Sequence, residues 1–177
     1  PIVFEVHYTD GTKDSKTVWV EKESHVVKIL NPGNKKIDFI LFDPNSEIMK
    51  TVTFNKPFEM LKAQALRAPK MIDRYDAITA MRNIPATQKL ELLNEVYLKN
   101  TFHGVRTEIV SQILDDKTPE SLKLIKQGLN DKDVFVRKGI VANTKTIDPS
   151  LMSDYEKLLL DSSYQTIVTV LEKLCFQ

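Results

Sequence analysis

Residues of the kinds that build chemical sites are scarce in this chain. Its 177 residues include one cysteine, three histidines and five glycines. The single Cys175 excludes an internal disulfide but leaves the cellular compartment open, and we expect it to pack as a small apolar residue. The glycines form neither G-x-G-x-x-G nor G-x-x-x-x-G-K, so neither kind of phosphate-binding loop is present.

Metal-binding patterns are missing as well. No histidine belongs to an H-E-x-x-H motif or to another metal-spaced cluster, and we assign no role to His7, His25 or His103. The acidic pairs Asp115-Asp116 and Asp131/Asp133 could bind a cation, but acidic helix ends explain them more simply. We therefore predict no catalytic, metal-binding or cofactor-binding residue, and no enzyme activity of this chain itself.

Excess charge and long apolar runs are also absent. Lys and Arg number 25 and Asp and Glu 24, a net charge of +1 that gives no general attraction for nucleic acid or an anionic membrane. No segment reaches the roughly 18 apolar residues that span a bilayer, and the N-terminus carries no secretory signal pattern. We predict a soluble chain, cytoplasmic or periplasmic, without nucleic-acid or membrane partners.

Apolar and polar residues alternate in the first third of the chain, which predicts antiparallel strands. Asp10-Gly11 supplies a hairpin turn after the first strand. The predicted strands cover residues 2–8, 16–21, 25–30, 36–42 and 48–54. Several are apolar on both faces, so we expect residues 1–54 to form an incomplete antiparallel β-sandwich-like domain. Because a strand begins at once at Pro1, we expect a longer polypeptide upstream.

Helical periodicity replaces alternation after residue 54. Prolines 57, 85, 119 and 149 stand near the expected starts of the first helix of four pairs, because a missing N–H costs little there. The first helices are predicted at 57–67, 87–99, 119–129 and 149–160, and the second helices at 71–82, 103–114, 132–146 and 161–175. A period near 31 residues predicts an α-α superhelix of HEAT-like pairs over residues 55–177. The fold class is therefore α+β, with its two parts segregated.

Arginines recur at one place in the second helices, at Arg74, Arg106 and Arg137. Asp131 stands six residues before Arg137, which resembles the Asp and Arg ladder of HEAT repeats. Asn100 precedes Arg106 in the same way, while Ala68 and Leu159 interrupt the ladder in the first and fourth pairs. The arginines could instead face a partner or a peptide carboxylate, but we favour the ladder.

An aspartate follows the apolar run Phe39 to Phe42. Asp43-Pro44 could hold a catalytic aspartate at a strand end, but we favour a structural turn in which Asp43 caps its own backbone.

Three stretches together resemble the C-terminal part of aminopeptidase N-like zinc aminopeptidases, a gluzincin metallopeptidase family. They are VHYTDGTKDSKTVWVEKES, FILFDPNSEIMKTVTFNKP and KAQALRAPKMIDRYDAITAM. The first two contain the end of a sandwich with the Asp43-Pro44 turn. The third contains a D-R-x-x-A signature from Asp73 to Ala77. The likeness covers about residues 2 to 82.

This resemblance implies a non-catalytic C-terminal fragment. The parent would remove N-terminal residues from peptides with zinc held by an upstream catalytic domain, which would be the fragment's partner together with peptide substrates. The helical domain would cap the active-site cleft and restrict peptide access. The zinc motif, the substrate-amine loop and the catalytic tyrosine have no counterpart here. The alternative is a stand-alone HEAT-repeat scaffold or adaptor that binds protein.

Overall fold

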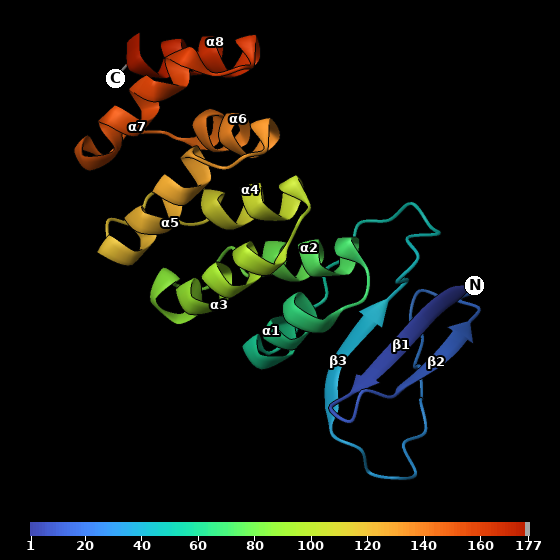
Figure 1. The fold of residues 1–177 in the computed structure, drawn as a ribbon. Helices are drawn as coiled ribbons and strands as arrows, with labels where there is room; N and C mark the ends of the chain where they lie inside the picture. The colour runs from blue at the N-terminus through green and yellow to red at the C-terminus, as the bar shows by residue number, and fades with distance from the viewer. Residues whose placement is uncertain (176–177) are drawn as a thin grey trace. The chain divides into compact units, whose positions relative to one another are not determined.

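The computed structural model describes residues 1–175 (Figure 1). Within them the chain is α+β, with a three-stranded antiparallel sheet followed by eight α-helices. It divides into two compact units, Pro1–Ala77 and the part from Ile78 onward. The first helix thus shares a compact unit with the sheet. The domain boundary predicted between residues 54 and 55 stays a prediction.

The sheet has the order β2-β1-β3, with β1 (Ile2–Tyr8) between β2 (Lys13–Val18) and β3 (Ile37–Phe42). The predicted hairpin at Asp10-Gly11 is confirmed. Gly11 has a φ of 82°, its amide donates to Tyr8 O at 3.0 Å, and the Tyr8 amide donates to Thr12 O at 2.9 Å. A positive φ is costly for residues with a side chain, so glycine suits this place.

Two predicted strands are wrong, because residues 25–30 and 48–54 form no strand, and the strand predicted at 16–21 lies instead at Lys13–Val18. Both segments alternate as strands do, but alternation indicates a strand only where a neighbouring backbone is free to pair with it. Here the Lys16 ammonium donates to Lys28 O at 2.5 Å, and side chains such as Val26 and Met49 are exposed.

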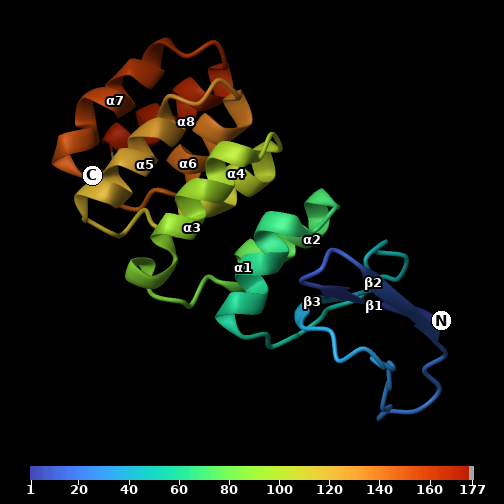
Figure 2. The ribbon, with the colours of Figure 1, turned by 60° about the horizontal axis from the view of Figure 1, so that its bottom comes forward.

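One sheet face packs on α1 (Phe58–Arg67), and α2 (Met71–Ala80) follows. Figures 1 and 2 both show α1 beside β3. The core here combines Phe39 and Leu41 of β3 with Ala63, Ala68 and Met60. Small alanines let the helix approach the sheet closely. The Arg67 guanidinium holds the same contact at its edge, donating to both Asp38 oxygens at 2.7 and 2.5 Å.

The second unit contains the remaining helices. They are α3 (Ala86–Lys99), α4 (His103–Ser111), α5 (Pro119–Leu129), α6 (Val134–Asn143), α7 (Met152–Lys157) and α8 (Tyr164–Cys175). All eight helical segments predicted from the periodicity are present, α1 and α2 included. The segment predicted at 149–160 is broken, because short 3-10 turns at Pro149–Leu151 and Leu158–Leu160 flank α7.

Successive second helices stack on one another in this unit, α4 against α6 and α6 against α8, and α5 packs beside both α4 and α6 (Figure 1). Val105, Ile109, Val136 and Ile140 are fully buried between them. A Cβ added at Gly139 would lie 2.5 Å from Thr107 Cγ2, so the α4 and α6 backbones approach too closely for a larger residue.

Two further observations concern the surface. Cys175 is exposed, so the expectation that it packs in the core is wrong. Its place near the end of α8 lies on a helix face that the described residues leave open. No helix in the described part of the chain has the length and apolar character needed to cross a membrane.

Candidate functional site

Asp43 and Pro44 form a buried turn in which the Asp43 carboxylate accepts several hydrogen bonds. Asp43 has a φ of 48°, and its carboxylate accepts hydrogen bonds from the amides of Glu47 at 3.0 Å and Ile48 at 3.2 Å and from the Lys50 ammonium. Burial by itself raises the pKa of Asp43, but these hydrogen bonds outweigh it and hold the pKa below its usual value. The carboxylate therefore fixes its own loop.

A second cluster in the first unit joins α1 to β3 and to α2. The Lys56 ammonium donates to Ile40 O and to Gln64 Oε1, both at 2.6 Å, and the Gln64 amide donates to Asp73 O at 2.7 Å. Burial lowers the pKa of Lys56 to about 8. Burial, together with the nearby Asp76 charge, raises the pKa of Asp73 to about 6. Both groups are held closer to their neutral forms.

Arg74 follows Asp73 on α2 and is half-buried. Its Nε is buried without a hydrogen-bond partner among the described residues. Asp73 Oδ2 is also buried without a hydrogen-bond partner among the described residues. Ala68, six residues before Arg74, offers only its backbone amide, which donates to Gln64 O at 3.0 Å. The first copy of the arginine repeat thus lacks the turn aspartate that the third copy has.

Arg106 on α4 is tied to two turns. Its Nη1 donates to Asn100 O at 3.1 Å and to Thr101 O at 2.9 Å, in the turn before its own helix. Its Nη2 donates to Asp131 Oδ1 at 3.1 Å, and its Nε forms an ion pair with Oδ2 at 2.9 Å. The Tyr97 hydroxyl donates to the same Oδ2 at 2.5 Å. Asp131 therefore joins the turn before α6 to α3 and α4.

Arg137 on α6 repeats this pattern one pair later. Its Nη1 donates to Asp131 O at 2.7 Å, in the turn before its own helix. Its Nε and Nη2 donate to the two oxygens of Asp161 at 2.6 and 3.0 Å. The hydrogen bond with Asp161 raises the pKa of Arg137, and the hydrogen bond from Arg137 lowers the pKa of Asp161. Each arginine thus reaches its own turn and the aspartate of the next.

The fourth pair has a ladder aspartate, although we predicted that Leu159 interrupts the ladder there. Asp161 accepts from the Ser163 amide two residues on, just as Asp131 accepts from the Asp133 amide. The equivalent of Asp131 is therefore Asp161 and not Leu159, and Ile167 rather than Gln165 occupies the arginine position. Asp161 and Ile167 each lie 30 residues after their counterparts in the third pair, close to the period near 31, whereas Leu159 and Gln165 would lie only 28 residues after them.

A polar hollow of about 420 Å³ lies on the second helices. Its lining comprises Arg82, Glu108, Ser111, Gln112 and Asn143. The Arg82 guanidinium donates to both Glu108 oxygens at 2.7 Å, and the Asn143 amide donates to Ser111 Oγ at 3.0 Å. Burial by itself raises the pKa of Glu108, but hydrogen bonds from Arg82 and Gln112 lower it overall. The hollow therefore offers a carboxylate, a guanidinium, amides and a hydroxyl together.

The buried side chain of Lys89 holds Gln112, one of the residues that line the hollow, in place. The Lys89 ammonium donates to Met81 O and to Gln112 Oε1, both at 2.8 Å, and the Gln112 amide donates to Ile78 O at 2.7 Å. Sequence reasoning missed this group. A signal existed, because Lys89 stands at helical spacing from buried Leu93 and Val96, where a charge requires partners.

These side chains form no metal site. In residues 1–175, no three His, Cys, Asp or Glu side chains are placed to hold a metal ion. Comparisons of the chain with protein-family models, curated proteins and solved structures found no significant match. The family resemblance of the first 82 residues therefore stays a prediction.

Proposed function

We propose that the helical part is a HEAT-like array whose second helices bind an extended peptide at the polar hollow. The ladder supports this, because Arg106–Asp131 and Arg137–Asp161 fix the turns of successive pairs in one register. A rigid array presents a fixed surface to a partner at low entropic cost.

The observation that carries the peptide proposal is the chemistry of the hollow. Asn143 Oδ1 and Gln112 Oε1 can accept from peptide N–H groups, whereas the Nδ2 of Asn143 already donates to Ser111 Oγ and Gly139 O and the Nε2 of Gln112 to Ile78 O and Glu108 Oε1. Arg82 and Glu108 add the two charges that a peptide's ends or charged side chains would pair with. The ring of hydrogen bonds beneath the hollow holds these groups in place.

The context we propose is an aminopeptidase N-like zinc aminopeptidase. In this proposal the chain is its non-catalytic C-terminal part, and an upstream domain holds the zinc and removes N-terminal residues. The helical array then limits which peptides reach the catalytic cleft. The residue likeness over about 2 to 82 supports this. β2 and β3 are also edge strands among the described residues, and upstream strands would extend the sheet by pairing with them.

Peptide binding is testable on the purified chain. We expect dye-labelled peptides of several residues to bind in fluorescence anisotropy, and Asn143→Ala to weaken binding about fivefold, the value of one lost hydrogen bond. Gln127→Ala is the matched control, because Gln127 is an exposed amide on α5, outside the hollow. Absence of saturable binding by any peptide, or equal losses in both variants, would overturn the proposal.

The aminopeptidase context has separate tests. The reading frame upstream of Pro1 should encode H-E-x-x-H, and the purified chain should release no product from aminoacyl anilides with zinc or with a chelator. A reading frame without that motif would remove the aminopeptidase context but leave the peptide-binding proposal standing.

A second candidate function is a protein-binding scaffold without a zinc domain. An exposed aromatic cluster favours it, in which the His103 ring contacts the rings of Phe102 and Phe135 in tilted arrangements, with centroids 4.6 and 5.0 Å apart. Such side chains are frequent anchors at protein interfaces. A saturable protein partner whose binding is lost in Phe135→Ala would support this function.

A further inference from the structure

The side-chain amides of the polar hollow have no hydrogen-bond donor left for a ligand. Both N–H groups of the Asn143 amide are used, one on Ser111 Oγ at 3.0 Å and one on Gly139 O at 2.9 Å. Both N–H groups of the Gln112 amide are also donated within the protein, at 2.7 and 2.9 Å. An amide nitrogen carries only two hydrogens. Among these described side chains, the Ser111 O–H remains as the single donor.

Acceptors are left open in the same hollow. Asn143 Oδ1 receives no hydrogen bond from the described residues, and its side chain is exposed. From the described residues, Gln112 Oε1 accepts one hydrogen bond, which Lys89 donates at 2.8 Å. Glu108 Oε2 accepts one from Arg82 at 2.7 Å. Because each of these oxygens has two lone pairs, the hollow presents acceptors to a ligand.

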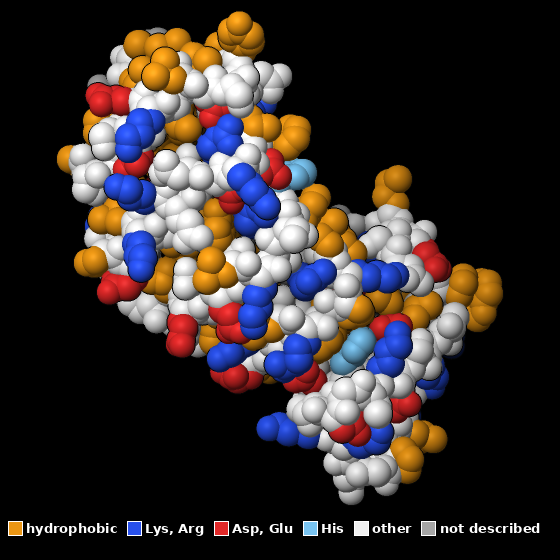
Figure 3. All heavy atoms as spheres, in the orientation of Figure 1, with side chains coloured by type: hydrophobic (Ala, Val, Ile, Leu, Met, Phe, Trp, Pro, Cys, Tyr) orange, Lys and Arg blue, Asp and Glu red, His pale blue; other side chains and the backbone are white. Residues whose placement is uncertain are grey.

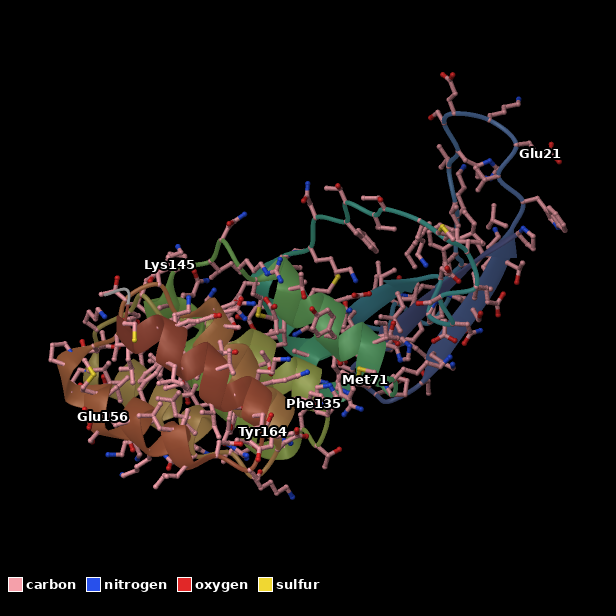
Figure 4. The ribbon with its side chains drawn as sticks, turned by 90° about the horizontal axis from the view of Figure 1, so that it is seen from above. Glu21, Met71, Phe135, Lys145, Glu156 and Tyr164 are labelled. Carbon is pink, nitrogen blue, oxygen red and sulfur yellow. The ribbon has the colours of Figure 1, made fainter. Side chains whose placement is uncertain are left out.

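The hollow also lies at the C-terminal ends of two helices. α4 ends at Ser111 with Gln112 as its C-cap, and α6 ends at Asn143. Figure 4 labels Lys145, two residues past that end of α6, and Phe135 near the other end. The last carbonyl groups of a helix carry partial negative charge, which favours a cation nearby. The helix ends and the open acceptors therefore favour the same kind of ligand.

The charges around the hollow are nearly balanced. The three N–H groups of the buried Lys89 ammonium are directed to Met81 O, Arg82 O and Gln112 Oε1, so none is left for a ligand. The Arg82 side chain is 56% exposed, so water solvates it when it leaves Glu108. The charges of Glu108 and Lys89 then cancel. On the face that Figure 3 shows, basic and acidic side chains are interspersed, so no broad field opposes a cation.

We propose that the hollow binds a primary ammonium group of its peptide, either the free N-terminus or a lysine side chain, and that this group displaces Arg82 from Glu108. An ammonium has three donors and no acceptor, which complements a site whose own groups accept. A carboxylate would place its oxygens against Asn143 Oδ1 and Glu108 with no hydrogen between them. The inference rests on the proposed peptide binding and adds the chemical group that is recognised.

Four peptides of one parent sequence without basic residues, each carrying a neutral dye at an amidated C-terminus, test this on the full chain by fluorescence anisotropy. The first has a free N-terminus, and the second is N-acetylated. The third is N-acetylated and contains one lysine, and the fourth has that lysine acetylated as well. We expect the first or the third to bind at least about tenfold more tightly than the second and fourth, as a hydrogen bond to a charged group does. Tighter binding of the first assigns the N-terminus, and tighter binding of the third assigns a lysine side chain.

The other outcomes separate this inference from the proposed function. Equal binding of all four peptides overturns the ammonium site and leaves peptide binding standing. A preference for an N-acetylated peptide with a free C-terminal carboxylate does the same. Absence of binding by every peptide overturns both.

Arg82→Ala tests the competition by its sign. The substitution removes the competing cation, so we expect it to tighten binding of the ammonium-bearing peptide about threefold, the value of a partly exposed ion pair. Lys123→Ala is the matched control, because it removes an equal charge from an exposed side chain on α5 and should leave the affinity unchanged. Unchanged or weaker binding in Arg82→Ala overturns the proposal.

Glu108→Gln removes the charge that the ammonium would pair with. We expect the ammonium-bearing peptide to bind this variant no more tightly than its acetylated counterpart, and a preference that survives overturns the proposal. Circular dichroism checks that the variants keep their helical signal. If Glu108→Gln loses that signal, Arg82→Ala decides alone, because the Arg82 side chain is exposed.

Discussion

The two compact units treat buried charge in opposite ways. In the first unit, Lys56 is half-buried and Asp73 is buried, and their pKa values move toward neutrality, to about 8 and about 6. In the ladder of the second unit, Arg137 and Asp161 are paired, and both pKa values move further toward the charged forms. Each unit has an exception: burial lowers the pKa of Lys89 in the second unit, and in the first unit hydrogen bonds from Lys50 and two backbone amides outweigh burial and lower the pKa of Asp43.

The difference arises because a repeated structure places residues of opposite charge next to each other. In a helical repeat, a charge at one position meets its counterpart one period later, so one spacing pairs Arg106 with Asp131 and Arg137 with Asp161. The sheet unit has no such rule. Its charges are brought together by pairings between distant segments, and Asp73 Oδ2 and Arg74 Nε are left without partners among the described residues. We therefore expect neutralisation of Asp131 to lower the free energy of unfolding and neutralisation of Asp73 to raise it.

The largest expected effect is the loss of Asp131. Asp131→Ala leaves the buried Arg106 guanidinium and the Tyr97 hydroxyl without their shared acceptor. We expect the free energy of unfolding of the helical unit to fall by about 3 kcal/mol. Urea denaturation followed by circular dichroism measures it. Asp115→Ala is the control, because Asp115 forms an exposed ion pair with Lys145 at 3.4 Å and should change little. Equal losses of stability in Asp131→Ala and Asp115→Ala would contradict this prediction.

Neutralising Asp73 should raise the free energy of unfolding. Its folded pKa of about 6 lies above its ordinary 3.8, so the folded chain binds a proton that the unfolded chain releases between these values. Stability from this group therefore falls as pH rises through that window. We expect Asp73→Asn to raise the free energy of unfolding at pH 7 by about 1–2 kcal/mol.

The pH profile decides whether Asp73 is the cause. Thermal melts of the variant should lack the component that falls between pH 4 and 6 in the parent chain, and below pH 4 the two should converge. An Asp73→Asn chain that is less stable than the parent at pH 7 would show that the carboxylate is stabilised by its surroundings.

Packing between pairs should give a smaller effect. Gly139→Ala places a methyl group 2.5 Å from Thr107 Cγ2. We expect about 1 kcal/mol of destabilisation, since overpacking outweighs the better helix propensity of alanine. Thr107→Ser removes the clashing methyl group, so in that background Gly139→Ala should become neutral or stabilising. A double-mutant cycle in urea measures this coupling, and additive effects would contradict the close approach of α4 and α6.

The smallest effect is expected at the edge of the first unit. Arg67→Ala removes the bidentate contact from α1 to Asp38 on β3, and Arg67 is largely solvent-exposed. We expect a loss of about 0.5 to 1 kcal/mol. Hydrogen exchange of α1 and β3 locates it. A loss as large as that of Asp131→Ala would show that paired charges matter equally in both units.

Helices were far easier to predict from the sequence than strands. A helix satisfies its hydrogen bonds within one segment, so the apolar stripes and proline-marked starts indicated all eight helical segments. A strand needs a partner, so the alternation at 25–30 and 48–54 was a necessary condition but not a sufficient one. Of the site residues, Arg137 and Asp131 were identifiable by their spacing, and Lys89 by its place on the buried stripe of α3. The backbone carbonyls that Lys89 and Gln112 bind depend on the tertiary structure.

By itself the sequence determined the α+β class, the period of the helical pairs and the Asp10-Gly11 hairpin, because each depends on residues close together in the chain. Only the tertiary structure decided that Asp161 continues the ladder, that Lys89 supports a polar hollow and that Cys175 is exposed. These facts depend on which distant segments meet. Burial and hydrogen-bond geometry, rather than the local conformational preferences of the residues, determine those tertiary contacts.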